Sequence, residues 1–269
     1  MYKLFFLFLI PFTILYASSV PNFKELDKTQ DAVFFLSTPR SGTNLVSASL
    51  SAITRKPISW ISWKEKIFKP NTPLKDHPSY NRLGLPLVTE EPLFYRTHDD
   101  FLQLNQIPSR CNKLIFITRN PKELLFRKFL TQNSSEKIPD RKFIKEYLDK
   151  YLQTFQVYDS WFSANRSLVF YEDFIRRGDE ILLELVQFMG EKPTHLLDFQ
   201  TNKEKYMSML LASYQEQHKT VLGGLSARRG PTEIYYTKNA PLEVLTYIDD
   251  YIKKTAPNIW EKYLTRFQS

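Results

Sequence analysis

STPRSGTNLV, residues 37–46, joins an apolar run at residues 32–36 to a stretch of helical character. A strand, a tight turn and a helix start are what a phosphate-binding loop requires. The first amides of such a helix are unpaired, and the helix dipole adds partial positive charge at the same place. The stretch therefore predicts an anion site at the end of a strand.

The side chains of this turn agree with that prediction. Gly42, one of only seven glycines, lets the backbone approach an anion, while Ser41 and Thr43 can donate hydroxyl groups. Arg40 adds a full charge and a planar fork of donors. The GxxxxGK[ST] pattern of P-loop nucleotide hydrolases is absent, which disfavours that class. An ordinary strand-to-helix turn with an exposed arginine stays open as the simpler interpretation.

A second strand, turn and helix follow at residues 113–123. The run KLIFIT ends at Arg119, after which Asn120 can cap a helix and Pro121 suits its first position. Glu123 completes a capping-box-like arrangement. Ligands of open parallel sheets bind at the carboxyl ends of the strands. Arg119 and Arg40 can therefore bind two separate phosphates of one ligand.

The rest of the chain indicates an α/β fold: an open, mainly parallel sheet flanked by helices. Short runs rich in Val, Ile and Phe predict strands at residues 32–37, 93–97, 113–118 and 167–171. Apolar periodicity predicts helices at 140–162 and 179–189, the second ending on Gly190. Residues 57–92 hold six prolines and are expected to be irregular, over one end of the sheet.

The composition limits the possible fold classes, partners and metal sites. The 269 residues are 42% hydrophobic and can bury a substantial core. The net charge of +8 suits an anionic partner without identifying it, and the single Cys111 excludes an internal disulfide and a cysteine-cluster metal site. Residues 1–22 have the charged start and short apolar run of a signal peptide, with a signal-anchor as the alternative. Residues 23–269 are expected to form one domain.

Five segments of the chain, which occur in the same order as in the family, resemble the sulfotransferases that use 3′-phosphoadenosine 5′-phosphosulfate (PAPS). Residues 37–43 are similar to its 5′-phosphosulfate loop and residues 117–123 to its 3′-phosphate motif. Arg96-Thr97-His98 resembles a Lys-Thr-His segment that carries the catalytic base, and residues 168–173 a strand followed by an adenine-contacting tyrosine. Arg228-Arg229-Gly230 is similar to a late Arg-Lys-Gly contact. The resemblance spans residues 32 to 230.

Several positions depart from the family pattern. Arg40 replaces a lysine, as in membrane-associated and secretory-pathway relatives, and Leu45 replaces an adenine-stacking tryptophan. Arg127 stands where most members have a 3′-phosphate-binding serine, and residues 231–234 replace a Gly-Asp-Trp-Lys segment. These changes put the affinity for the nucleotide in question.

The resemblance implies a P-loop NTPase-like sulfotransferase fold and in-line transfer of a sulfuryl group from PAPS to an acceptor hydroxyl, with no metal. Arg40 would stabilise charge on the leaving oxygen. His98 would be the catalytic base. Glu65 is the alternative base, because tyrosine-protein sulfotransferases use a glutamate after the first helix. The residues implied to bind the donor are Arg40, Ser41, Gly42, Thr43, Asn44, Arg119, Arg127, Tyr171, Arg228, Arg229 and Gly230.

The partners implied are the nucleotide donor and an acceptor that is a phenol, a peptidyl tyrosine or a carbohydrate. Membrane association through residues 4–17 and an exported or membrane-associated location follow from the leader, whereas the dispersed basic residues disfavour nucleic acid. Two rival functions remain: a non-catalytic binding module with the same fold, and a nucleotide-dependent kinase.

Overall fold

The computed structural model describes residues 33–60, 79–97, 113–132, 138–161, 163–217, 237–238 and 240–268. Six strands form one sheet in the order β3-β2-β4-β1-β5-β6. They are β1 (Val33–Ser37), β2 (Ile58–Trp60), β3 (Ser79–Tyr80), β4 (Tyr95–Thr97), β5 (Lys113–Thr118) and β6 (Arg166–Phe170). Only β3 runs antiparallel to its neighbour within this sheet. The predicted α/β class is confirmed.

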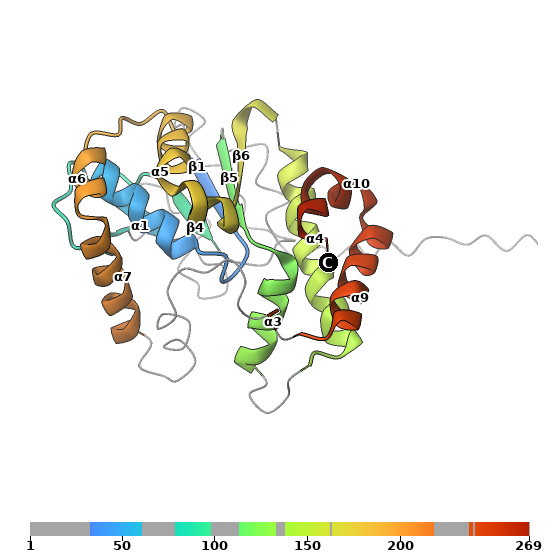
Figure 1. Ribbon diagram of the computed structural model, residues 1–269. Coiled ribbons are helices and arrows are strands. Elements are labelled where there is room, and N and C mark those ends of the chain that lie inside the picture. Colours follow the sequence, from blue (N-terminus) through green and yellow to red (C-terminus); the bar gives the residue numbers. More distant parts are fainter. Residues whose placement is uncertain are drawn as a thin grey trace, which may run out of the picture.

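Helices cover both faces of the sheet (Figure 1). One side carries α1 (Thr43–Thr54), α5 (Tyr171–Phe188), α6 (Leu196–Thr201) and α7 (Lys203–Gln217). The other carries α3 (Pro121–Gln132), α4 (Arg141–Ser160), α9 (Leu242–Thr255) and α10 (Pro257–Ile259). Two short 3-10 helices, η3 (Ser163–Asn165) and η5 (Thr265–Phe267), and a short π-helix, η4 (Trp260–Leu264), complete the described elements.

Alternation along the central strands explains why their sequences are apolar at every position. Phe34 and Leu36 of β1 pack into the core beneath α3, α4 and α9, whereas Val33 and Phe35 pack into the core beneath α1 and α5. The four residues 114–117 of β5 alternate in the same way. A parallel strand buried on both faces needs apolar side chains in both directions.

The pairing register brings three connections to one edge of the sheet. Ser37 of β1 lies beside Ile117 of β5, and Thr118 of β5 lies beside Phe170 of β6. The residues that follow these strands, at 38–42, 119–120 and 171, therefore meet at the carboxyl ends. This is the edge at which the sequence predicted a site.

Several predicted boundaries differ from the structure. Residues 57–92 were expected to be irregular, yet they contribute β2 and β3 to the sheet, and β4 begins at Tyr95 rather than at residue 93. The helix expected at 179–189 is the part of α5 that follows a kink at Arg177 (φ −128°, ψ 35°), and a further helical segment from Tyr171, directly after β6, precedes that kink. Its end at Gly190, with φ of 80°, is confirmed.

The predicted leader, residues 1–22, lies outside the described residues. No helix in the part of the chain that the structure describes is both long enough and apolar enough to cross a bilayer.

Candidate active site

The turn after β1 is held closed by Ser41. Its amide donates to the Thr38 carbonyl at 3.2 Å, and its hydroxyl donates to the carbonyls of Thr38 at 2.7 Å and Ile117 at 3.2 Å. The side chain is fully buried. The sequence predicted that this hydroxyl binds an anion, but all three hydrogen bonds are made within the protein, and the one to Ile117 fastens the turn to β5.

The next three amides are the candidate anion site. The first helical donors of α1 are Leu45 and Val46, which both bond to the Gly42 carbonyl. The N–H groups of Gly42, Thr43 and Asn44 precede them and make no hydrogen bond within the described residues. Three unpaired amides at the positive end of a helix dipole are suited to bind an anion. Gly42 has φ of 87°, which turns the chain into the helix.

Tyr171 packs directly against this loop. A Cβ atom added to Gly42 would lie 2.2 Å from Tyr171 Cδ2, so only glycine fits at this position with the ring in place. The same ring stacks on Arg119, whose guanidinium carbon lies 4.6 Å from the ring centroid. Tyr171 thus stands between the phosphate loop and the arginine after β5, and it joins the two halves of the predicted site.

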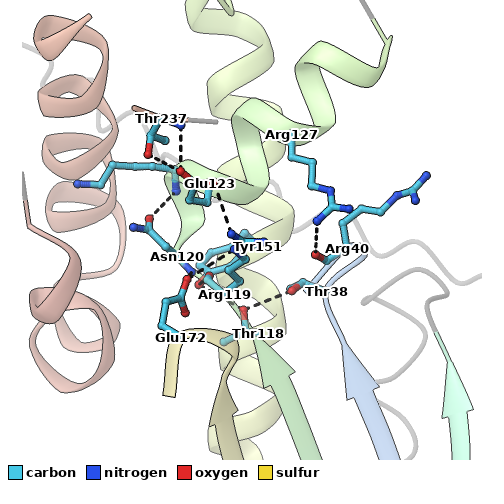
Figure 2. A network of polar contacts seen from close by, with 11 residues as sticks. Thr38, Arg40, Thr118, Arg119, Asn120, Glu123, Arg127, Tyr151, Glu172 and Thr237 are labelled. Carbon is cyan, nitrogen blue, oxygen red and sulfur yellow. Dashed lines mark hydrogen bonds and ion pairs between the residues drawn. The ribbon is translucent and has the colours of Figure 1, made fainter. Parts of the chain in front are cut away.

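Arg119 is enclosed by two glutamates (Figure 2). Its Nη2 lies 3.6 Å from Glu123 Oε2, and its Nε lies 3.7 Å from Glu172 Oε1. All three side chains are buried, with exposures of 3%, 0% and 6%. Buried charges require such pairing, because an isolated one would cost several kcal/mol in lost hydration.

The start of α3 supports this arginine. Asn120 Oδ1 accepts from the Lys122 amide at 3.0 Å, which confirms the predicted cap. The predicted capping box is wrong, since the Asn120 amide donates to Glu172 Oε1 at 3.0 Å rather than to Glu123. Glu123 Oε1 instead accepts from the amide and hydroxyl of Thr237, at 2.9 Å and 2.5 Å. Glu123 therefore links Arg119 to a distant part of the chain.

Burial changes the proton affinities around Arg119. It raises the pKa of Glu172, partly offset by the Asn120 amide and the Arg119 charge. Burial also raises the pKa of Tyr151 well above its ordinary value. The Tyr151 hydroxyl donates to the Arg119 carbonyl at 3.0 Å, so it remains a neutral donor that fixes the end of β5. Thr38 and Thr118 share a further hydroxyl contact of 3.3 Å between the two strand ends.

Arg127 reaches the phosphate loop. Its Nη1 donates to the Arg40 carbonyl at 3.4 Å, while Arg40 adopts the left-handed region with φ of 73° (Figure 2). Sequence reasoning placed Arg127 with Arg119 on one phosphate. The structure gives it a contact with the backbone of a non-glycine residue at positive φ, a conformation that costs about 1–2 kcal/mol. Leu45, which replaces the family's tryptophan, packs half-buried against the core on the α1 side.

Sequence reasoning used Arg96 only as part of a motif, and the structure gives it a specific place. This residue of β4 is 2% exposed, and its Nη1 donates to Asn44 Oδ1 at 2.6 Å. Ser47 Oγ and Tyr80 Oη both lie at 3.4 Å from the same nitrogen. Arg96 therefore fixes the first turn of α1 to the sheet. Its position at a strand end beside the phosphate loop was the available signal.

The remaining predicted residues lie outside the described part of the chain: His98, Glu65, Arg228, Arg229 and Gly230. The described histidine His195 has a structural place, because its backbone amide donates to the Ile53 carbonyl at 2.9 Å at the start of α6. No group of three or more histidine, cysteine or carboxylate side chains among the described residues could hold a metal ion.

Comparison with known proteins gives a family. The family model described as the sulfotransferase domain matches residues 30–257. Human sulfotransferase 2A1 is 26% identical over 200 residues, which cover 65% of this chain and 68% of that protein. Sulfotransferase 1E1 of Bos taurus is 22% identical over 189 residues, 64% of this chain and 63% of its own length. The chain thus spans less than two thirds of the bovine relative.

Two solved structures share the fold. Mouse sulfotransferase SULT7A1 complexed with PAP superposes with a TM-score of 0.53 at 16% identity, covering 88% of this chain and 87% of that one. Retinol dehydratase in complex with androsterone and inactive cofactor PAP gives a TM-score of 0.50 at 12% identity, covering 83% and 80%. At such low identity these likenesses establish the fold and nothing finer.

Proposed function

Because the chain belongs to the sulfotransferase domain family, we propose that it moves a sulfuryl group from PAPS to the hydroxyl group of an acceptor. The observation that carries this proposal is the pair of anion-binding features joined by Tyr171. The Tyr171 ring lies against Gly42, which begins a run of three unpaired amides at the start of α1, and the Arg119 guanidinium stacks on the same ring. A nucleotide with separated phosphates has the chemistry to use both.

In this proposal the amides of Gly42, Thr43 and Asn44 bind the 5′-phosphosulfate, and Arg119 binds the 3′-phosphate. Tyr171 lies between them, in reach of the nucleoside. The structures of SULT7A1 and retinol dehydratase both contain PAP, the product expected from PAPS, which supports this class of donor. Arg228, Arg229 and Gly230 are proposed to add contacts to the 3′-phosphate.

The transfer step needs positioning and charge rather than a metal. The acceptor oxygen attacks sulfur in line, a new S–O bond forms, and the bond from sulfur to the bridging oxygen breaks. Adenosine 3′,5′-bisphosphate leaves with that electron pair, and Arg40 stabilises its negative charge. The acceptor proton passes to His98, or to Glu65 as the alternative base.

The contacts of Ser41 and Arg127 lead us to propose other roles for them than those expected from the sequence. Ser41 is proposed to fasten the loop rather than to bind phosphate through its hydroxyl, since that group donates to two carbonyls. Arg127 is proposed to support the Arg40 backbone, because its guanidinium donates to that carbonyl. The acceptor class stays a phenol, a peptidyl tyrosine or a carbohydrate, and export or membrane attachment through residues 1–22 stays a proposal.

The test is a transfer assay of the full chain with PAPS labelled in its sulfuryl group and a panel of phenolic, peptidyl and carbohydrate acceptors. We expect label to move to one acceptor class. Arg40→Ala should lower kcat by about 10²–10³-fold, the usual effect of losing one stabiliser of a developing oxyanion. Removing the base, by His98→Ala or Glu65→Gln, should cost about 10²–10⁴-fold, and only one of the two variants should show it.

The binding-module alternative is favoured by three departures from the family pattern: the half-buried Leu45 in place of a stacking tryptophan, Arg127 in place of a serine, and residues 231–234 in place of Gly-Asp-Trp-Lys. It predicts nucleotide binding without transfer to any acceptor. A kinase would instead transfer phosphate from ATP with magnesium. Either pattern in the same assay would replace the proposed activity.

A further inference from the structure

Among the described residues, the charges around Arg119 do not balance. One arginine faces two glutamates, Glu123 and Glu172, at 3.6 Å and 3.7 Å, and all three are almost fully buried. If both carboxyl groups are ionised, this cluster carries one excess negative charge. A phosphate that binds Arg119 brings further negative charge into the same space, where like charges repel strongly. Binding is therefore favoured if one carboxyl group becomes neutral.

The two glutamates differ in how well their charge is stabilised. Glu123 receives the amide and the hydroxyl of Thr237, which both donate to its Oε1. Glu172 Oε1 receives one amide, from Asn120, whereas its Oε2 is buried and has no hydrogen-bond partner among the described residues. A protonated carboxyl group keeps its acceptor oxygen for the Asn120 amide. Of the two glutamates, Glu172 therefore loses less hydrogen-bond stabilisation when its carboxylate is protonated.

The other charged groups near Glu172 that the structure describes do not remove this imbalance. Arg266 of η5 is the second nearby cation, but it forms two bonds to Asp173, one at 2.7 Å, and is balanced by that carboxylate. Lys122 of α3 is paired with Asp249 of α9 at 2.9 Å. Among the described residues, the charged and titratable groups that act on Glu172 are Arg119, Arg266 and Tyr151. Glu123 and Asp173 are the carboxylates paired with those two arginines.

We propose that Glu172 is a positioning residue for the donor's 3′-phosphate: it holds Arg119 in the free protein and takes up one proton when that phosphate becomes the arginine's partner. This inference rests on the proposed function. It adds a proton to the binding equilibrium that the transfer chemistry itself does not require. Burial, which already raises the pKa of Glu172, lowers the cost of this protonation.

The sign of the pH dependence follows. Proton uptake on binding means that affinity for the 3′-phosphorylated nucleotide falls as pH rises, by up to about tenfold per pH unit for one proton. The phosphate's own titration has the opposite sign, because its dianion binds an arginine better. Measurements above about pH 7 avoid this second effect, since the second pKa of a phosphate monoester is about 6.

The experiment is calorimetric titration of the full chain in two buffers of different ionisation enthalpy, which counts the protons taken up. The ligands are adenosine 3′,5′-bisphosphate and adenosine 5′-monophosphate, which lacks the 3′-phosphate. The variant is Glu172→Gln, which keeps the shape and the acceptor but cannot take up a proton. Glu180→Gln, an exposed glutamate of the same helix, is the matched control.

We expect the wild type and Glu180→Gln to take up roughly one more proton with the bisphosphate than with the monophosphate. Glu172→Gln should take up no additional proton, and its bisphosphate affinity should be nearly constant with pH. The same proton count and pH dependence in Glu172→Gln would overturn the inference. If that variant does not fold, equal proton counts for the two ligands in the wild type overturn it.

Failure of the proposed function would give a different result. In that case the wild type would bind the bisphosphate no more tightly than the monophosphate at any pH. Tight, selective bisphosphate binding without proton uptake would leave the donor site in place and reject the role of Glu172 alone.

Discussion

At the scale of single residues, the contact between Gly42 and Tyr171 decides whether the two halves of the site can meet. The ring lies where a Cβ atom of residue 42 would be, and the backbone there has φ of 87°. Gly84 offers a matched comparison, because it has φ of 61° and nothing within 4 Å of an added Cβ. An alanine at residue 84 would have only the cost of the left-handed backbone, whereas an alanine at residue 42 would also clash with the Tyr171 ring.

Gly84→Ala should lower the free energy of unfolding by about 1–2 kcal/mol, the cost of a left-handed non-glycine residue. Gly42→Ala should cost more than that and should also weaken nucleotide binding, because Tyr171 must move away from the loop. Denaturant unfolding and nucleotide titration of both variants check this. Equal losses of stability, with unchanged nucleotide affinity, would contradict the placement of Tyr171.

Glu172 also has an effect on stability that does not depend on any ligand. Its pKa is raised in the folded protein by burial, whereas in the unfolded chain it has the ordinary value of about 4.3. The folded state therefore binds this proton more tightly. Its stabilising contribution is fully present below the unfolded pKa and is lost as pH rises through the folded pKa.

The stability of the wild type relative to Glu172→Gln should thus decrease as pH rises from about 4.3 toward neutrality. Denaturant midpoints of both proteins across this range measure the difference. A difference that is constant, or that grows in favour of the wild type, would mean that burial does not dominate at this carboxyl group.

At the scale of elements, the start of α3 is fixed to the C-terminal helices by one buried pair. Lys122 Nζ lies 2.9 Å from Asp249 of α9, and it also donates to the Phe267 carbonyl at 2.5 Å. Both side chains of the pair are at most 5% exposed. Lys122 lies within the first turn of α3, the helix that follows Arg119. The ion pair with Asp249 therefore fixes the position of the backbone that carries Arg119.

Lys122→Met should lower the free energy of unfolding by about 3–5 kcal/mol, since it leaves a buried carboxylate without its cation. The double variant Lys122→Met/Asp249→Leu should recover much of that loss. Lys203→Met is the control, because Lys203 and Asp179 form an exposed pair at 2.6 Å and such pairs contribute below about 1 kcal/mol. A similar effect of Lys122→Met and Lys203→Met in denaturant unfolding would contradict this account.

At the scale of the whole molecule, the sequence was most informative where local pattern and burial agree. Residues 33–37 and 113–118 are apolar throughout because they are covered on both faces, so strands and fold class could be predicted from them. The turns at residues 38–42 and 119–120 were likewise expected at one edge of the sheet, and the pairing register places them there.

Features that depend on distant contacts could not be predicted in this way. The strands β2 and β3 are three and two residues long. They exist because β4 provides an edge for β2, and β2 in turn provides an edge for β3. Glu123 has the spacing of a capping box, but its carboxylate bonds to Thr237, far along the chain. Arg96 became part of the site only when β4 and the first turn of α1 were placed side by side.

The central claim is that the edge formed by β1, β5 and β6 binds a nucleotide with a 3′-phosphate. The most direct measurement is calorimetric titration of the full chain with adenosine 3′,5′-bisphosphate and, separately, with ATP, in the wild type and in Arg119→Ala. Arg166→Ala is the control, because Arg166 is a partly buried arginine at the opposite end of β6, bonded to the Tyr158 carbonyl.

The wild type and Arg166→Ala should bind the bisphosphate more tightly than ATP. Arg119→Ala should lose about 10- to 100-fold in bisphosphate affinity, as expected for about 1.5–3 kcal/mol from a hydrogen bond between charged groups. A folded wild type that binds the bisphosphate no better than ATP, or an Arg119→Ala variant that binds it equally well, would contradict the account.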